Sequence, residues 1–320
     1  MGPYLLRRFA VSIPVLIGIT MATFALVSFA PGDPVSALIS PESAGELGPE
    51  WVAQQRAHLG LDQPLPIRYF RWSEQLLRGN LGFSTMDQQP IAGKIFARVE
   101  PTLLLMGLAQ LMSILIAVPI GVLSALKQYS VIDYLVTVLG FAAISIPSFF
   151  LALAGIFIFG LKLKMLPTSG MRTIGDASSF ADLLRHLILP ASILGLASAA
   201  PLIRYVRSSM LEVIHQPYVN VARAKGLSEN SVVYGHAARN ALVPLVTVVT
   251  LALPGLIGGT VIIESIFAWP GMGQLAIAAV RARDYPMIMA LNLITAVLIL
   301  SCNLLADVIY AIVDPRIAYS

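Results

Sequence analysis

Residues 217–244 decide the fold, and they read PYVNVARAKGLSENSVVYGHAARNALVP. This segment is polar, whereas the stretches on both sides of it are apolar enough to lie in lipid. Pro217 suits the first turn of a helix, where its missing N–H would be unpaired anyway, and Gly226 supplies the left-handed residue that ends this helix. Ser228 is suited to cap a second helix. The sequence therefore predicts two short helices that meet at a glycine between two membrane spans, and residues 211–240 are called the elbow.

The composition indicates a membrane protein. Of the 320 residues, 57% are hydrophobic and only 12% are charged, whereas soluble domains are about a quarter charged. The net charge of +4 is too small to indicate a nucleic-acid partner. The single cysteine, Cys302, lies in an apolar run, which excludes an internal disulfide and a cysteine-based metal site.

Six apolar stretches are long enough to cross a bilayer as helices. The first, residues 9–29, follows Arg7 and Arg8, so the positive-inside rule places the N-terminus in the cytoplasm. The other five stretches are residues 102–126, 134–161, 187–203, 241–267 and 287–313. Pro147 predicts a kink in the third stretch, residues 134–161. The predicted fold class is all-α, a polytopic membrane protein with six transmembrane helices and both termini in the cytoplasm.

The chain divides into three parts. Residues 1–30 hold the N-terminus and the first span, and residues 31–101 form the one long polar segment. Amphipathic helices are predicted within that segment at residues 48–60 and 67–78, and its place after the first span makes it extracytoplasmic. Residues 102–320 form a core with five spans and the elbow.

The elbow resembles a known coupling segment. Residues 222–227, Ala-Arg-Ala-Lys-Gly-Leu, followed by His-Ala-Ala-Arg-Asn-Ala-Leu at 236–242 and by Pro244, are similar to the coupling segment of ABC-importer permeases. The likeness is closest to the B-type subunit of the dipeptide, oligopeptide and nickel permease family. It implies the type I ABC importer permease fold, with the elbow docked into a cleft of a cytoplasmic ATPase. The residues assigned to ATPase coupling are Asn220, Ala222, Arg223, Ala224, Lys225, Gly226 and Leu227.

Two points about the elbow stay open at this level. The broader family pattern has Glu where this chain has Asn220, so the residue that anchors the elbow to its ATPase is not identified. Arg223 and Lys225 lie two residues apart and therefore point to different faces of their helix, so only one of them is expected to face the ATPase. The competing interpretation of the whole segment is an ordinary helix–turn–helix connection.

The resemblance extends over nearly the whole chain and implies a set of partners. They are a second homologous permease, two ATPase subunits, an extracytoplasmic solute-binding protein and the lipid of the bacterial inner membrane. ATP and magnesium are expected on the ATPase subunits, and no cofactor is expected on this chain. For residues 31–101, capping the translocation path and meeting the binding protein is one interpretation, and simple surface packing is the other. The other matching stretches are residues 30–34, 59–65, 77–82, 269–273, 283–286 and 314–317.

The fifth span holds the candidates for a translocation path or gate. Glu264 lies near its outer end. Burying an acidic side chain at that depth costs free energy unless it is paired with another polar group or solvated by water. It either lines the path or pairs with an outer arginine such as Arg281 or Arg283. The candidates in this span are Pro254, Gly258, Gly259 and Glu264.

Catalytic motifs are absent from the sequence. It has no phosphate-binding loop of the form GxxxxGK[ST] and no HExxH or GxSxG pattern. ATP hydrolysis is therefore expected on separate partner subunits, and the chain is predicted to be a transporter subunit and not an enzyme. The alternative, a self-sufficient secondary transporter, predicts inverted repeats and several intramembrane acids. The substrate stays open among dipeptides, oligopeptides, nickel complexes, glutathione and sugars.

Overall fold

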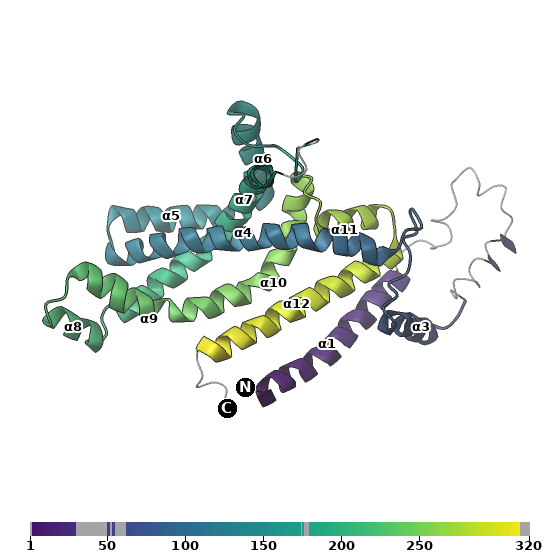
Figure 1. Cartoon of the computed structure of the whole chain (residues 1–320), viewed down its shortest axis with the longest axis horizontal. Coiled ribbons are helices and arrows are strands. Elements are labelled where there is room, and N and C mark those ends of the chain that lie inside the picture. The colour runs from purple at the N-terminus through teal and green to yellow at the C-terminus, as the bar shows by residue number, and fades with distance from the viewer. Residues whose placement is uncertain are drawn as a thin grey trace.

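The protein is described here from a computed structural model, which covers residues 2–29, 50, 51, 53, 54, 62–173, 175 and 179–313. Over these residues the chain is a bundle of long helices with short connections (Figure 1), in agreement with the predicted all-α class. The predicted helix at 48–60 and the family-like stretches at 30–34 and 314–317 lie largely or wholly outside the described residues. The elements are α1 (Gly2–Phe29), α3 (Leu65–Leu77), α4 (Ile91–Leu126), α5 (Val131–Ser145), α6 (Ser148–Gly155), the π-helix η3 (Ile156–Lys162), α7 (Phe180–Val213), α8 (Pro217–Ala224), the π-helix η4 (Ser231–Ala238), α9 (Arg239–Ala241), α10 (Val243–Ile266), α11 (Met272–Arg281) and α12 (Tyr285–Val313).

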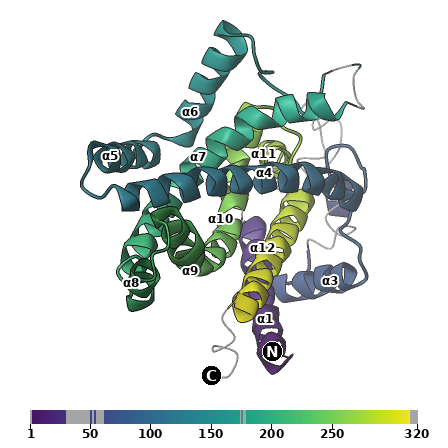
Figure 2. The ribbon, with the colours of Figure 1, turned by 60° about the vertical axis from the view of Figure 1, so that its left-hand side comes forward.

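Length and composition allow up to six membrane spans. Four single helices qualify, namely Leu6–Phe29, Ile91–Leu126, Phe180–Val213 and Tyr285–Ile309. Two more spans arise if each bent pair counts as one, namely Val131–Ser145 with Ser148–Lys162 and Ser231–Ala241 with Val243–Ile257. The start of α1 and the end of α12 lie at the same end of the bundle in Figures 1 and 2, and Arg8 of α1 forms an ion pair with Asp307 of α12 at 3.3 Å. This arrangement fits an even number of crossings.

The third span is broken, not merely kinked. The helices on either side of the break are bent by 99° relative to one another. Ile146 is extended, with a ψ of 123°, because the ring of Pro147 disfavours the helical conformation in the residue before it. As a result the chain turns away from α5 at this break (Figure 2), and α6 packs against α7 and α10, with Ala152 fully buried.

The predicted boundary between the outer segment and the core lies inside a helix. α4 begins at Ile91 and continues through Pro101 and Thr102, so residues 91–101 are part of the second span's helix and not of a separate segment. Proline inside a membrane helix is tolerated where neighbouring groups donate hydrogen bonds to the freed carbonyls.

The amphipathic helix predicted at residues 67–78 is present as α3.

α4 and α7 form the central packed pair. A Cβ on Gly121 of α4 would lie 2.7 Å from Cβ of Val206, and a Cβ on Gly195 of α7 would lie 2.7 Å from the carbonyl oxygen of Ala109. Small residues of this kind let two membrane helices approach closely enough for backbone contact. The helices therefore meet at two glycines, one on each partner.

We predict that Gly121→Ala and Gly195→Ala each destabilise the folded protein by about 1–3 kcal/mol, because the added methyl group meets a neighbouring helix. Gly107→Ala on α4 is the matched control, since nothing lies within 4 Å of its added Cβ, and it should be neutral or slightly stabilising. Thermal unfolding of the purified protein in detergent checks this. Equal unfolding temperatures for the three variants would contradict the close packing.

Candidate functional site

The elbow has the local structure that its sequence predicted. α8 starts at Pro217 and ends at Ala224, and Gly226 follows with a φ of +77°. The Ser228 hydroxyl accepts a hydrogen bond from the backbone N–H of Ser231 at 3.4 Å, as the cap of the second helix. The chain thus reverses at a left-handed glycine between two short helices.

The inner face of the elbow is packed into the protein. Its buried side chains share one apolar cluster with the ends of α4 and α7. An elbow held in this way has to move together with those two helices. The buried elbow residues are Val219, Ala222, Val232, Val233, Ala237 and Ala238, and they share the cluster with Val122 of α4 and with Val206 and Met210 of α7.

The outer face of the elbow combines apolar and basic groups. Val221 is 53% exposed and Leu227 is 42% exposed, although both are large apolar side chains. Lys225 is exposed, and the described residues offer it no ion-pair partner. Of the seven residues predicted to couple, Ala222 is buried in the cluster and packs inside the elbow in this conformation, and its part in ATPase coupling stays a prediction.

The Arg223 side chain is hydrogen-bonded within the elbow. Its guanidinium donates to the two carboxylate oxygens of Glu229 at 2.8 and 3.2 Å, and to the side-chain oxygen of Asn220 at 3.4 Å. The hydrogen bond from Arg223 holds the pKa of the Glu229 carboxyl below its ordinary value. Sequence reasoning missed Glu229, because the turn at Gly226 brings it back over α8. The structure thereby distinguishes the two basic residues, since Arg223 braces the turn and Lys225 faces outward.

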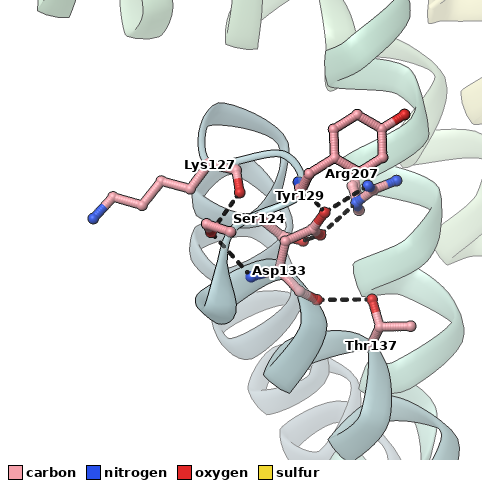
Figure 3. A network of polar contacts seen from close by, with 7 residues as sticks. Ser124, Lys127, Tyr129, Asp133, Thr137 and Arg207 are labelled. Atoms are coloured by element: carbon pink, nitrogen blue, oxygen red, sulfur yellow. Dashed lines mark hydrogen bonds and ion pairs between the residues drawn. The ribbon is translucent and has the colours of Figure 1, made fainter.

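A buried carboxylate at the start of α5 joins the end of α4 and the loop after it to α7 (Figure 3). Asp133, only 4% exposed, accepts hydrogen bonds from the Arg207 guanidinium at 2.7 and 2.8 Å. It also accepts from the Ser124 hydroxyl at 2.5 Å and from the backbone N–H of Tyr129 at 3.0 Å. The network joins α4, α5 and α7 at the elbow end of the bundle. Separating these helices would be costly, because it would leave a buried charge without its partner. The sequence marked Arg207 only as a basic residue at the end of a span.

Glu264 is held by a helix N-terminus. Its side chain has no exposed surface, and its carboxylate accepts from the backbone N–H groups of Gly273 at 2.7 Å and Gln274 at 3.3 Å, in the first turn of α11. The Thr102 hydroxyl donates to it at 2.7 Å and accepts from the N–H of Met272 at 2.9 Å. Unpaired N–H groups and the helix dipole favour an anion at such a position.

These contacts bear on the two sequence-based roles of Glu264. The carboxylate is fully buried in this conformation, and its role in the translocation path stays a prediction. Its hydrogen bonds come from α11 and Thr102 and not from Arg281 or Arg283, the partners that the sequence suggested. The group instead joins α10, α11 and α4.

Two glycines make room for this carboxylate. A Cβ on Gly271 would collide with the Glu264 carboxyl group, and a Cβ on Gly273 would lie 2.5 Å from Cα of Val261 and 2.9 Å from Oε2 of Glu264. Trp269, which is fully buried, donates its indole N–H to the carbonyl of Pro101 at 2.9 Å. The family-like stretch at residues 269–273 is therefore the structural partner of Glu264.

The remaining path candidates lie along α10. Pro254, Gly258 and Gly259 are all inside its helical span, Val243–Ile266, and their role as a path or gate stays a prediction.

Sequence reasoning did not single out Gln110 and Ser113 of α4, whose side-chain polar atoms are buried without a hydrogen-bond partner among the described residues. The described part of the chain also holds no cluster of three or more His, Cys, Asp or Glu suited to a metal ion.

Two family matches together cover nearly all of the chain. Residues 117–319 match the binding-protein-dependent transport system inner membrane component, and residues 1–110 match the N-terminal region of these membrane components. The chain belongs to this family of transport permeases. The predicted family resemblance is confirmed.

Relatives and a solved structure agree with this assignment. The permease is 41% identical to the oligopeptide transport system permease protein AppB of Bacillus subtilis, over 100% of both chains. It is 36% identical to the dipeptide transport system permease protein DppB of Escherichia coli K12, over 99% of this chain and 98% of the relative. Its fold is similar to a chain of the MetNI methionine ABC transporter in an inward-facing conformation, with a TM-score of 0.55 and 19% identity over 68% of this chain and 95% of that one. The predicted type I ABC importer permease fold is confirmed.

The permease is a multi-pass inner-membrane subunit of an ABC importer. It is not an enzyme, since ATP is hydrolysed on separate subunits, and it works with permease, ATPase and binding-protein partners. The alternative of a self-sufficient secondary transporter is set aside, because members of this family depend on those ATPase subunits.

We predict that Glu264→Gln lowers the stability of the permease by about 1–3 kcal/mol, because the amide turns an NH₂ group toward one of the donors that now face the carboxylate. Gly271→Ala should have a similar effect by displacing the carboxylate, whereas Gly255→Ala, with nothing within 4 Å of its added Cβ, is the matched control. Abundance in the membrane and transport per molecule are measured together. Normal abundance with lost transport in Glu264→Gln would contradict the structural role.

Proposed function

We propose that this permease forms one side of the path of a peptide importer and that the elbow drives its opening and closing. The proposal rests on one observation above all: the elbow is buried on one face against α4 and α7 and presents exposed apolar side chains on the other. Such a surface suits a protein partner. Oligopeptides and dipeptides are the proposed substrates, because those words stand in the names of the relatives that align with the whole chain.

The proposed assembly contains this chain, a second related permease, two ATPase subunits that bind ATP and magnesium, and an extracytoplasmic solute-binding protein. Both termini and the elbow lie in the cytoplasm, and the polar segment between the first span and α4 forms part of the outer side, where the binding protein docks. Pro254, Gly258 and Gly259 are proposed to border the path.

In the proposed mechanism Leu227 and Val221 enter a cleft of the ATPase, and Lys225 pairs with an acidic group on its rim. Arg223 takes no direct part, because Glu229 occupies its guanidinium. ATP-driven closure of the two ATPase subunits moves the elbows toward one another. The elbow carries α4 and α7 with it, since they share a buried cluster. This movement closes the path on one side of the membrane and opens it on the other.

A test of the substrate uses a strain that lacks its own peptide importers and needs an amino acid that is supplied only within a peptide. We predict that the complete transporter restores growth on dipeptides or short oligopeptides, and that deleting this permease abolishes it. Uptake of a labelled peptide is the direct measurement. Failure to transport any peptide, with all subunits present in the membrane, would reject the substrate class.

A test of the coupling role uses Gly226→Val. At a φ of +77° a β-branched side chain costs about 1–2 kcal/mol, which is too little to unfold a membrane bundle. It is enough to tilt the turn out of a preformed cleft, so we predict that ATPase retention falls about tenfold and that uptake is lost while the permease stays in the membrane.

Gly235→Ala is the matched control on the same elbow, because its closest neighbour would be the Ser231 hydroxyl at 3.9 Å. It should keep both ATPase retention and uptake. Wild-type retention and uptake in Gly226→Val would show that the elbow is only a connecting turn.

A further inference from the structure

A groove lies beside the elbow, away from its glycine turn. It has a cavity volume of about 380 Å³, within the range of small-ligand sites. One wall is the last third of α4 and the other is the second helix of the elbow. The lining residues are Val118, Pro119, Val122, Tyr234, Ala238, Arg239 and Leu242.

The groove has an apolar floor and a cationic rim. Arg239 is its one charged lining residue, and the side chain is exposed. Tyr234 is 62% exposed and brings a phenolic hydroxyl to the same rim. Neither side chain has a hydrogen-bond or ion-pair partner among the described residues. The rim is therefore complementary to an anion, and the floor to an alkyl group.

An apolar stripe continues the groove along α4. Leu111, Leu115 and Pro119 follow one another at intervals of four residues, so they lie on the same face of the helix. Leu111 is 51% exposed and Leu115 is 63% exposed. From Leu111 to Val122 the helix rises by about 16 Å, which is about half of the roughly 30 Å hydrocarbon core of a bilayer. The stripe thus has the length of one lipid leaflet.

We propose that this groove binds an anionic phospholipid, with its phosphate on Arg239 and Tyr234 and one acyl chain along α4. A partner protein would have to bring an acidic side chain down among apolar groups, at a large desolvation cost. A lipid phosphate already lies at the membrane–water boundary and carries its own alkyl chain, and basic residues there attract anionic lipids. The bound lipid would fill the space between α4 and the elbow and hold their spacing constant.

The test is native mass spectrometry of the transporter purified with the full chain and its partner subunits, after addition of phosphatidylglycerol or phosphatidylcholine. We expect phosphatidylglycerol to be retained preferentially. Arg239→Gln should lower its retention about fivefold, and Arg239→Lys should keep most of it. Lys127→Gln, which removes an exposed basic residue at the end of α4 outside the groove, should have no effect.

Three results would overturn the proposal. Equal retention of the two lipids would remove the preference for an anion, and unchanged retention in Arg239→Gln would place the lipid elsewhere. Binding of phosphatidylglycerol to the isolated chain but not to the assembled transporter would show that a protein partner covers the groove.

Discussion

The close packing of α4 against α7 is the contact on which the rest of the structure depends. Lipid offers little hydrophobic drive for two apolar helices to associate, so they depend on van der Waals contact between their surfaces. Gly121 and Gly195 allow that contact because neither carries a side chain that would hold the two helices apart. Apolar clusters extend from this pair in both directions, toward the elbow at one end and toward Phe267 and Trp269 at the other. A displacement of the elbow therefore moves α4 and α7 together.

Two buried carboxylates join further helices to this pair. Asp133 ties the start of α5 to Arg207 of α7 near the elbow, and Glu264 ties the first turn of α11 to α10 and to Thr102 of α4 at the other end. Each carboxylate accepts several hydrogen bonds, which offset the cost of burying its charge. With both ends fixed, the bundle is suited to rocking as a body, as the proposed mechanism requires.

The sequence predicted the features that depend on local chemistry and missed those that depend on tertiary contact. The apolar stretches, the left-handed Gly226 and the cap at Ser228 follow from composition and backbone preference. A proline predicts a break near residue 147 but not its angle of 99°. The partner of Glu264 was missed because backbone N–H groups at a helix start leave no mark in the residue types. Glu229 was missed for the same kind of reason, since only the folded turn brings it to Arg223.

The central claim is that the exposed face of the elbow contacts an ATPase subunit. The most direct measurement places a photoreactive benzoylphenylalanine at Leu227, at the turn of the elbow, in the assembled transporter, with Val138 on the exposed face of α5 as the control position. The account predicts a cross-link to an ATPase subunit from position 227, with a yield that changes on adding ATP, and none from position 138. No cross-link to the ATPase from position 227 in a transporter that hydrolyses ATP and takes up substrate would contradict it.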